Sequence, residues 1–236
     1  MVNRMRGMRF LFFAAALLAG IVLTGEDFSA AFAPGKWDRS QWLNVKSPRL
    51  SYVLEMLQKD DHIVNPTPDE PDEVIFKKYS DNVYAALVLN RKFSGNLLFS
   101  SRMSFDHRMA PLLVIAPELG KSADGKHPEF REHYEIVLYD EGINIWHHLY
   151  KNGKPSWYKA AYLKASFKPK KIYDLQIRIL YTPKGCQLIV RCDGREFGYT
   201  ELSMKKTPYY VGLIACEGRN RFYDFKVTGP KKQKKK

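Results

Sequence analysis

The sequence predicts an all-β fold: a two-sheet antiparallel sandwich of the jelly-roll type, preceded by a short helix. From residue 74 onward, short apolar segments bounded by turn residues recur about every 8 to 12 residues, which is typical of such a sandwich. The segment 172–181 alternates between apolar and polar side chains, as a strand with one buried face does. Hydrophobic residues make up 45% of the 236-residue chain, which is enough for a sizeable core and excludes wholesale disorder.

Residues 1–25 have the composition of a signal peptide. Three arginines precede the apolar run 10–25, and small residues follow it. We expect cleavage between residues 25 and 33, and export of the mature chain to the periplasm, the cell surface or the exterior. Retention of the run as an N-terminal membrane tether is the alternative, although 16 residues fall short of the roughly 20 that cross a bilayer.

Residues 34–73 form an extension before the predicted sandwich. Apolar residues at helical spacing after Ser47-Pro48 predict a short helix; they are Leu50, Val53, Leu54 and Leu57. The segment 63–73 contains three prolines and four carboxylates, which indicates a loop. The pattern leaves open whether this extension is a flap over a cleft or an edge of the sandwich.

Residues 74–228 are expected to supply the strands of the sandwich. Asp193-Gly194 is a strong hairpin signal, because both central residues of that turn need positive φ. Residues 217–220 are predicted to turn a closing hairpin, and the lysine-rich residues 229–236 are predicted to be disordered. The expected strands are 84–90, 96–105, 109–116, 172–181, 186–192, 209–216 and 221–227.

Charge and cysteine content exclude several classes of protein. The net charge of +13 falls to +5 once the three leader arginines and five tail lysines are set aside, so we expect no nucleic-acid partner. Three cysteines are too few for a disulfide scaffold. Cys186 and Cys192 lie at opposite ends of one predicted strand and cannot pair with each other. We expect buried free thiols, and a bridge from either residue to Cys216 is the alternative if the sheets bring them together. No phosphate-binding loop or serine nucleophile motif is present, and no cofactor is predicted.

The segment 133–150 predicts a hairpin with one polar face and one apolar face. A two-residue loop at Glu141-Gly142 would pair Glu135 with His148, and the side chains of one face would then project together. A one-residue slip would mix polar and apolar positions, so the segregation selects the register; only His147 would lie with the apolar side chains. The predicted binding face consists of Arg131, His133, Glu135, Tyr139, Asn144, Trp146, His148 and Tyr150.

This face has the chemistry that carbohydrates require. Sugar rings stack on tryptophan and tyrosine, and sugar hydroxyls bond to carboxylate, amide and imidazole groups. We therefore predict an oligo- or polysaccharide partner, with a structural or interaction domain of the cell envelope as an alternative. Trp157 and Tyr158, after the Asn152-Gly153 turn, are expected either to line the rim or to pack in the core. His133, Glu135 and His148 share the face and could ligate one ion together, but we predict no metal.

Two segments resemble the concanavalin A-like lectin/glucanase superfamily. They are REHYEIVLYDEGINIWHH (131–148) and the closing YYVGLIACEGRNRFYDFKV (209–227), which is similar to the last hairpin of many exported bacterial domains in this group. The resemblance covers roughly residues 74–228 and implies the jelly-roll sandwich. The superfamily includes lectins, carbohydrate-binding modules, glycoside hydrolases and polysaccharide lyases, so the resemblance does not select an activity.

The catalytic candidates on this face are Glu135, His148 and Tyr150. Glucanases of the superfamily carry Glu, Asp and Glu at alternate positions, but here Val137 and Tyr139 follow Glu135. A retaining hydrolase needs two carboxyl groups about 5 to 5.5 Å apart, and the hairpin supplies one. A polysaccharide lyase is the better enzymatic alternative: histidine or tyrosine would act as base or acid, and Arg131 with Asn144 would neutralise the carboxylate of an acidic sugar.

Overall fold

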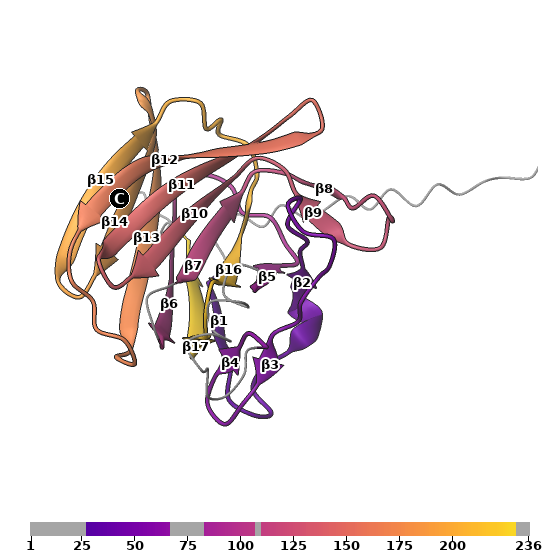
Figure 1. The fold of residues 1–236 in the computed structure, drawn as a ribbon. Coiled ribbons are helices and arrows are strands. Elements are labelled where there is room, and N and C mark those ends of the chain that lie inside the picture. The colour runs from indigo at the N-terminus through magenta and orange to yellow at the C-terminus, as the bar shows by residue number, and fades with distance from the viewer. Residues whose placement is uncertain (1–26, 67–82, 107–109, 230–236) are drawn as a thin grey trace, which may run out of the picture.

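The computed structural model describes residues 27–66, 83–106 and 110–229. Two large antiparallel sheets pack face to face, and a small hairpin lies beside them (Figure 1). The predicted all-β sandwich is confirmed. Among the described residues, no helix is long and apolar enough to cross a membrane.

The nine-stranded sheet includes strands from both ends of the described chain. Its strands are β1 (Phe28–Ala31), β3 (Leu57–Gln58), β4 (Ile63–Val64), β6 (Leu97–Phe105), β13 (Tyr173–Thr182), β14 (Gly185–Cys192), β15 (Arg195–Glu201), β17 (Asn220–Phe222) and β18 (Asp224–Thr228). The order is β15-β14-β13-β6-β17-β4-β3, and β18 pairs with both β6 and β1.

The seven-stranded sheet carries the predicted hairpin. Its strands are β2 (Trp42–Asn44), β5 (Tyr84–Leu89), β7 (Pro111–Ala116), β10 (His133–Tyr139), β11 (Gly142–Lys151), β12 (Lys154–Lys164) and β16 (Tyr210–Cys216). They are ordered β12-β11-β10-β7-β16-β5-β2. The separate hairpin pairs β8 (Leu119–Lys121) with β9 (Pro128–Phe130).

The main core lies between the two sheets. The apolar face of 172–181 is buried there as predicted, with Ile177 and Ile179 fully enclosed. The Asp193-Gly194 turn also forms as predicted, and both residues have positive φ, 50° and 75°. Cys186 and Cys192 are buried, and no disulfide joins the three cysteines, all of which the structure describes.

The predicted helix over residues 47–57 is wrong. This segment consists of turns, bends and extended chain, and a short helical turn, η1 (Arg39–Gln41), precedes it. The reason is packing: Leu54 contacts the core between the sheets, whereas Leu50 contacts the apolar cluster on the opposite face of the seven-stranded sheet. One helix of about ten residues is marginal by itself, and one face of it could not reach both clusters.

The N-terminal extension is an edge of both sheets. β4 and β3 end the strand order of the nine-stranded sheet, and β2 pairs with β5 at the end of the seven-stranded sheet. Figure 1 shows β2, β3 and β4, in indigo to purple, at one end of the sandwich. Phe32 and Trp42 then fill the end of the core, with their ring centroids 5.8 Å apart. Most of the predicted 63–73 loop lies outside the described residues.

The closing segment is not a hairpin. β16 pairs with β7 and β5 in the seven-stranded sheet, whereas β17 pairs with β6 and β4 in the other sheet. Residues 217–219 therefore carry the chain from one sheet to the other. Glu217 and Gly218 both have positive φ, 53° and 111°, which makes this sharp crossing possible.

Candidate functional site

The β10–β11 hairpin positions the candidate site, with its register two residues from the predicted one. Asp140 and Glu141 form the turn, so Tyr139 lies opposite Gly142 and His133 lies opposite His148. The predicted Glu141-Gly142 loop is wrong because Gly142 belongs to β11, where it allows a close approach to β12. A Cβ at this residue would lie 2.2 Å from the Leu163 carbonyl oxygen on β12. A shift of two residues keeps every side chain on its predicted face.

Part of the predicted face is covered by other segments of the chain. Val45 and Phe130, from the N-terminal extension and β9, pack with Val137 in an apolar cluster on this face. Backbone hydrogen bonds join Lys46 to Pro128 and Phe130, which fixes the two covering segments to each other. The covered part of the face is therefore a second core.

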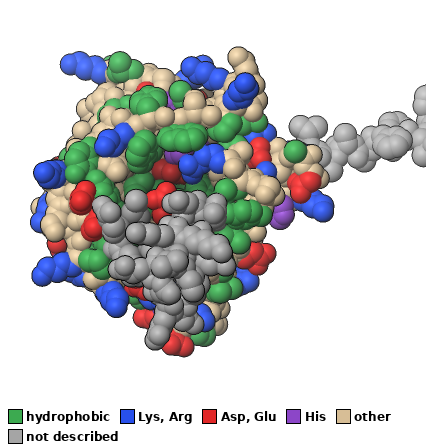
Figure 2. All heavy atoms as spheres, viewed as in Figure 1, with side chains coloured by type: hydrophobic (Ala, Val, Ile, Leu, Met, Phe, Trp, Pro, Cys, Tyr) green, Lys and Arg blue, Asp and Glu red, His purple; other side chains and the backbone are tan. Residues whose placement is uncertain are grey.

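The uncovered part of the face forms a cavity of about 340 Å³. Figure 2 shows acidic, basic and histidine side chains among hydrophobic ones on this side of the molecule. A β-bulge on β12, next to Trp146, interrupts the pairing of β11 with β12 at the cavity. The cavity is lined by Arg49, Ala110, Leu112, Glu135, Val137, Tyr139, Asn144, Trp146, His148, Trp157, Cys216 and Glu217.

Five of the eight predicted binding residues line this cavity, namely Glu135, Tyr139, Asn144, Trp146 and His148. The other three do not. His133 is buried behind Glu135 and His148. The Arg131 guanidinium lies 4.4 Å from the centre of the Tyr150 ring and bonds to Glu129 and to the Lys121 carbonyl oxygen.

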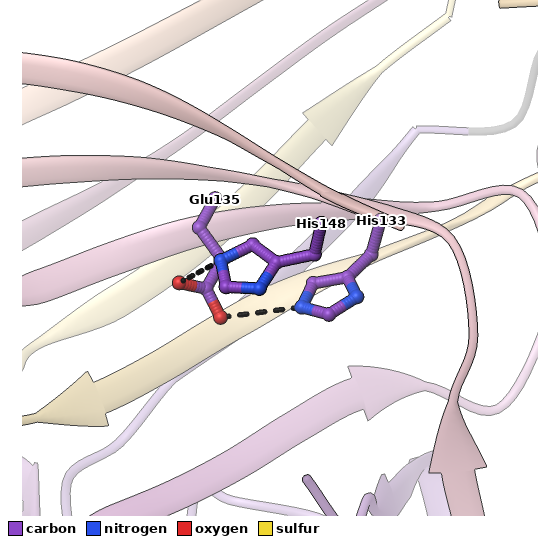
Figure 3. A group of neighbouring side chains, drawn as sticks. All are labelled: His133, Glu135 and His148. Atoms are coloured by element: carbon purple, nitrogen blue, oxygen red, sulfur yellow. Dashed lines mark hydrogen bonds and ion pairs between the residues drawn. The ribbon is translucent and has the colours of Figure 1, made fainter. Parts of the chain in front are cut away.

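A buried carboxylate is the centre of the site. Glu135 is 5% exposed and accepts a hydrogen bond of 2.8 Å from the Tyr84 hydroxyl. The Nε2 atoms of His133 and His148 approach its two oxygens at 3.3 and 3.0 Å (Figure 3). The two imidazoles stack with their centroids 4.4 Å apart, and Phe130 covers the far side of His133.

These contacts shift the protonation of the cluster. Burial alone would raise the pKa of Glu135, but the contacts with His148 and His133 outweigh it and hold the pKa well below its usual value. Burial lowers the pKa of His133, with Glu135 acting in the opposite direction. Burial and the neighbouring Glu135 carboxylate raise the pKa of Tyr84 well above its usual value. At neutral pH the site therefore holds an anionic carboxylate and a neutral phenol.

Acid is expected to destabilise the folded protein through this cluster. The His133 pKa lies below the 6.5 of an unperturbed histidine, so its stabilising effect is complete above that value and is lost as the pH falls toward the folded pKa. The Glu135 pKa lies below 4.5, so its effect is lost on further acidification. We expect the thermal midpoint to fall in both windows, and to fall less below about pH 4.5 in Glu135→Gln. A wild type and variant with parallel pH profiles would contradict this assignment.

Six of the residues that line the cavity lie outside the hairpin, and Arg49, Trp157 and Glu217 are the charged and aromatic ones among them. Arg49 enters from the N-terminal extension, and its guanidinium lies 5.8 Å from the Tyr84 ring centre and 5.0 Å from that of Trp157. Trp157, on β12, stacks against His148 at 6.1 Å. Glu217 follows β16 at the crossing between the sheets. The alternation along the hairpin could not predict Arg49 or Glu217 as cavity residues, because only the tertiary fold brings their segments to the cavity.

Glu217 supplies a second carboxylate to the cavity. Its backbone N–H donates to the Val83 carbonyl oxygen at 3.1 Å, which fixes the crossing beside the start of β5. The hairpin by itself offers only Glu135. The cavity therefore contains two carboxylates and an imidazole, a set of groups suited to acid–base chemistry.

His147, the polar exception on the apolar face, is buried in a second polar cluster. Its Nε2 lies 2.8 Å from Glu132 Oε1, and its Nδ1 lies 2.9 Å from the Tyr158 hydroxyl and 3.4 Å from Glu201 Oε2. Its ring stacks on Tyr134 at 4.3 Å. Because Glu201 belongs to β15, this cluster ties the edges of the two sheets together, away from the cavity.

Comparisons with known proteins support the fold. The sequence matches no family model and no curated protein. The structure is similar to a carbohydrate-binding module, CBM66, from Bacillus subtilis: TM-score 0.51, 12% identity, covering 80% of this chain and 96% of that one. It is also similar to a legume lectin-like domain from Entamoeba histolytica: TM-score 0.54, 12% identity, covering 85% and 96%. A third similar structure is a Bacillus licheniformis β-glucanase, with a TM-score of 0.52 and 10% sequence identity; the match covers 88% of this chain and 100% of that one. These similarities confirm the two-sheet jelly-roll fold that the resemblance implied.

Proposed function

We propose that this chain binds a glycan in the cavity lined by Glu135, Trp146 and His148. The observation that carries the proposal is the composition of that cavity, where aromatic rings and hydrogen-bonding groups line one concave space. Sugar C–H faces pack on indole and phenol rings, and hydroxyls bond to carboxylate, amide and imidazole groups. The cavity volume of about 340 Å³ falls in the range of small-ligand sites, so it fits one or two sugar units of a longer chain.

Asn144 adds a polar group that lacks a partner. Its side chain is 9% exposed and lines the cavity, and its Oδ1 has no hydrogen-bond partner among the described residues. A buried carbonyl oxygen without a donor is costly, by about 1 to 3 kcal/mol. A sugar hydroxyl that reached this oxygen from the cavity would supply the missing hydrogen.

Trp146→Ala is expected to weaken glycan binding by tenfold or more, because it removes the stacking surface, and tenfold corresponds to about 1.4 kcal/mol. Isothermal titration with a glycan retained in a panel screen measures this loss. Leu202→Ala is the matched control, since Leu202 is 79% exposed and does not line the cavity. An unchanged dissociation constant in Trp146→Ala would place binding elsewhere, and a near-complete loss of stability would show that the indole is mainly a core residue.

An enzymatic role at the same cavity is the second candidate, and Glu217 is the observation that favours it. Glu135, His148 and Glu217 line one space, so an acid and a base could act on one bound glycan. Incubation with polysaccharides would distinguish the reactions: unsaturated ends indicate a lyase, and new reducing ends indicate a hydrolase. Activity that disappears in both Glu217→Gln and His148→Ala would support this candidate, and retention without products would leave a binding domain.

Export is part of the proposal and rests on residues 1–25, which lie outside the described residues. We infer cleavage directly after Gly25. Cleavage after Ala31 or Ala33 would remove β1, which is hydrogen-bonded to β18, and the later site would also remove Phe32, which is fully buried. If the leader is retained, the same sandwich would be tethered to a membrane.

A further inference from the structure

The three side chains at the centre of the site have the composition of a metal site. His133, Glu135 and His148 each offer one ligand atom, and these atoms all lie within 4.8 Å of one another. All three side chains are at least nine-tenths buried. Figure 3 shows both imidazoles directed at the Glu135 carboxylate.

Hydrogen bonding defines the tautomer of His133. Its Nδ1 lies 2.8 Å from the Arg131 carbonyl oxygen, which can only accept, so Nδ1 carries a hydrogen. In the neutral ring Nε2 then presents a lone pair, and it faces Glu135 Oε1 at 3.3 Å. This contact therefore requires a cation at Nε2, either a second ring proton or a metal ion.

A proton is one such cation, and it satisfies one imidazole; the two stacked rings, with centroids 4.4 Å apart, both face a single carboxylate. One divalent ion would instead be shared by the lone pairs of both rings and by the carboxylate. The two Nε2 atoms lie 3.3 Å from Oε1 and 3.0 Å from Oε2 of the same carboxylate, and the three ligand atoms lie within 4.8 Å of one another, so small side-chain shifts would bring them around one ion.

The surrounding contacts are those that hold metal ligands in place. The Tyr84 hydroxyl donates to Glu135, and the Arg131 carbonyl oxygen orients His133. Such outer contacts fix the tautomer and direction of metal-binding side chains. Glu135 and His148 also line the cavity, so an ion held by the three residues would keep an open position toward it.

We propose that His133, Glu135 and His148 bind one divalent transition-metal ion, with zinc the best match, in a three-ligand site open to the cavity. Two nitrogens and one carboxylate with an open fourth position are the ligands of zinc sites that bind a further molecule. Nitrogen ligands disfavour Mg²⁺ and Ca²⁺, which prefer oxygen. In the open position the ion would take a water or a hydroxyl of the bound glycan, so this inference adds to the proposed function without depending on it.

Calorimetric titration of the metal-free mature chain with ZnCl₂, without any glycan, tests the proposal. We expect one zinc per chain, with affinity reduced 100-fold or more in His133→Ala and Glu135→Gln. His127→Ala should bind as the wild type does, because His127 lies in the β8–β9 hairpin. Cys216→Ser should also bind normally, although Cys216 lines the cavity. No binding by the wild type, or equal binding by His133→Ala, would overturn the proposal and leave a protonated cluster.

A second measurement covers the case in which a variant does not fold. X-ray absorption of the zinc-loaded wild type should show nitrogen and oxygen ligands at about 2.0 to 2.2 Å and no sulfur. A sulfur shell at about 2.3 Å would assign the ion to a cysteine and overturn the proposal.

Discussion

A chain that begins at Pro34 is expected to be at least about 4 kcal/mol less stable than one that begins at Glu26, because it lacks Phe32 and β1. The Phe32 side chain is fully buried, with ring centroids 5.8 Å from both Trp37 and Trp42. Its loss leaves a cavity at the end of the core, and the loss of β1 exposes one side of β18. Since single domains are stable by only about 5 to 15 kcal/mol, we expect a large fraction of the shorter chain to be unfolded.

Urea unfolding of the two chains measures this difference. Phe32→Ala in the longer chain should account for about 3 to 5 kcal/mol of it, since that is the usual cost of removing a buried phenylalanine ring. Removal of residues 230–236, outside the described residues, is the control. Equal urea midpoints for chains beginning at Glu26 and Pro34 would show that the N-terminal strand contributes nothing to the fold.

The second large loss of stability is expected on substitution of Glu135. Glu135→Leu removes the acceptor for the Tyr84 hydroxyl and for the two imidazoles, and it leaves these groups buried without partners. Breaking a buried ionic cluster in this way costs about 3 to 5 kcal/mol. Glu135→Gln should cost less, because the amide keeps the shape and one acceptor oxygen.

Denaturant midpoints again provide the measurement. The matched control is Glu196→Gln, which breaks an ion pair with Arg191 in which both side chains are about half exposed. Exposed pairs contribute about 0 to 1 kcal/mol, so this variant should stay close to the wild type. If Glu135→Leu were no less stable than Glu196→Gln, the buried cluster would not contribute to the fold.

The sequence was sufficient for the fold class and for the two faces of the hairpin, because both depend on local alternation. It was not sufficient for the register. A glycine at position 142 is equally compatible with a turn and with a close approach to a neighbouring strand. Only the assembled sheet shows that the close approach to β12 is the reason for it. The helix predicted after Pro48 failed for a similar reason: helical spacing fits Leu50 and Leu54, but tertiary packing divides them between two clusters.

The residues that line the cavity could be predicted from the sequence only in part. Alternation placed Glu135, Trp146 and His148 together, since all three lie on one hairpin. Arg49 and Glu217 enter from the N-terminal extension and from the crossing after β16, and no spacing rule connects those segments to the hairpin. Arg131 and Tyr150 were assigned to the binding face by extrapolating the alternation past the hairpin's open end, where they contact each other outside the cavity.

The most direct test of the account is a screen of the mature chain, residues 26–229, against immobilised glycans, run in parallel with Trp146→Ala and His148→Ala. Both residues line the cavity, from the same strand, β11. The account predicts that the wild type is retained on a definable class of glycan and that both variants, folded by circular dichroism, lose that retention. Retention that neither substitution changes, or no retention on any glycan with a folded wild type, would contradict it.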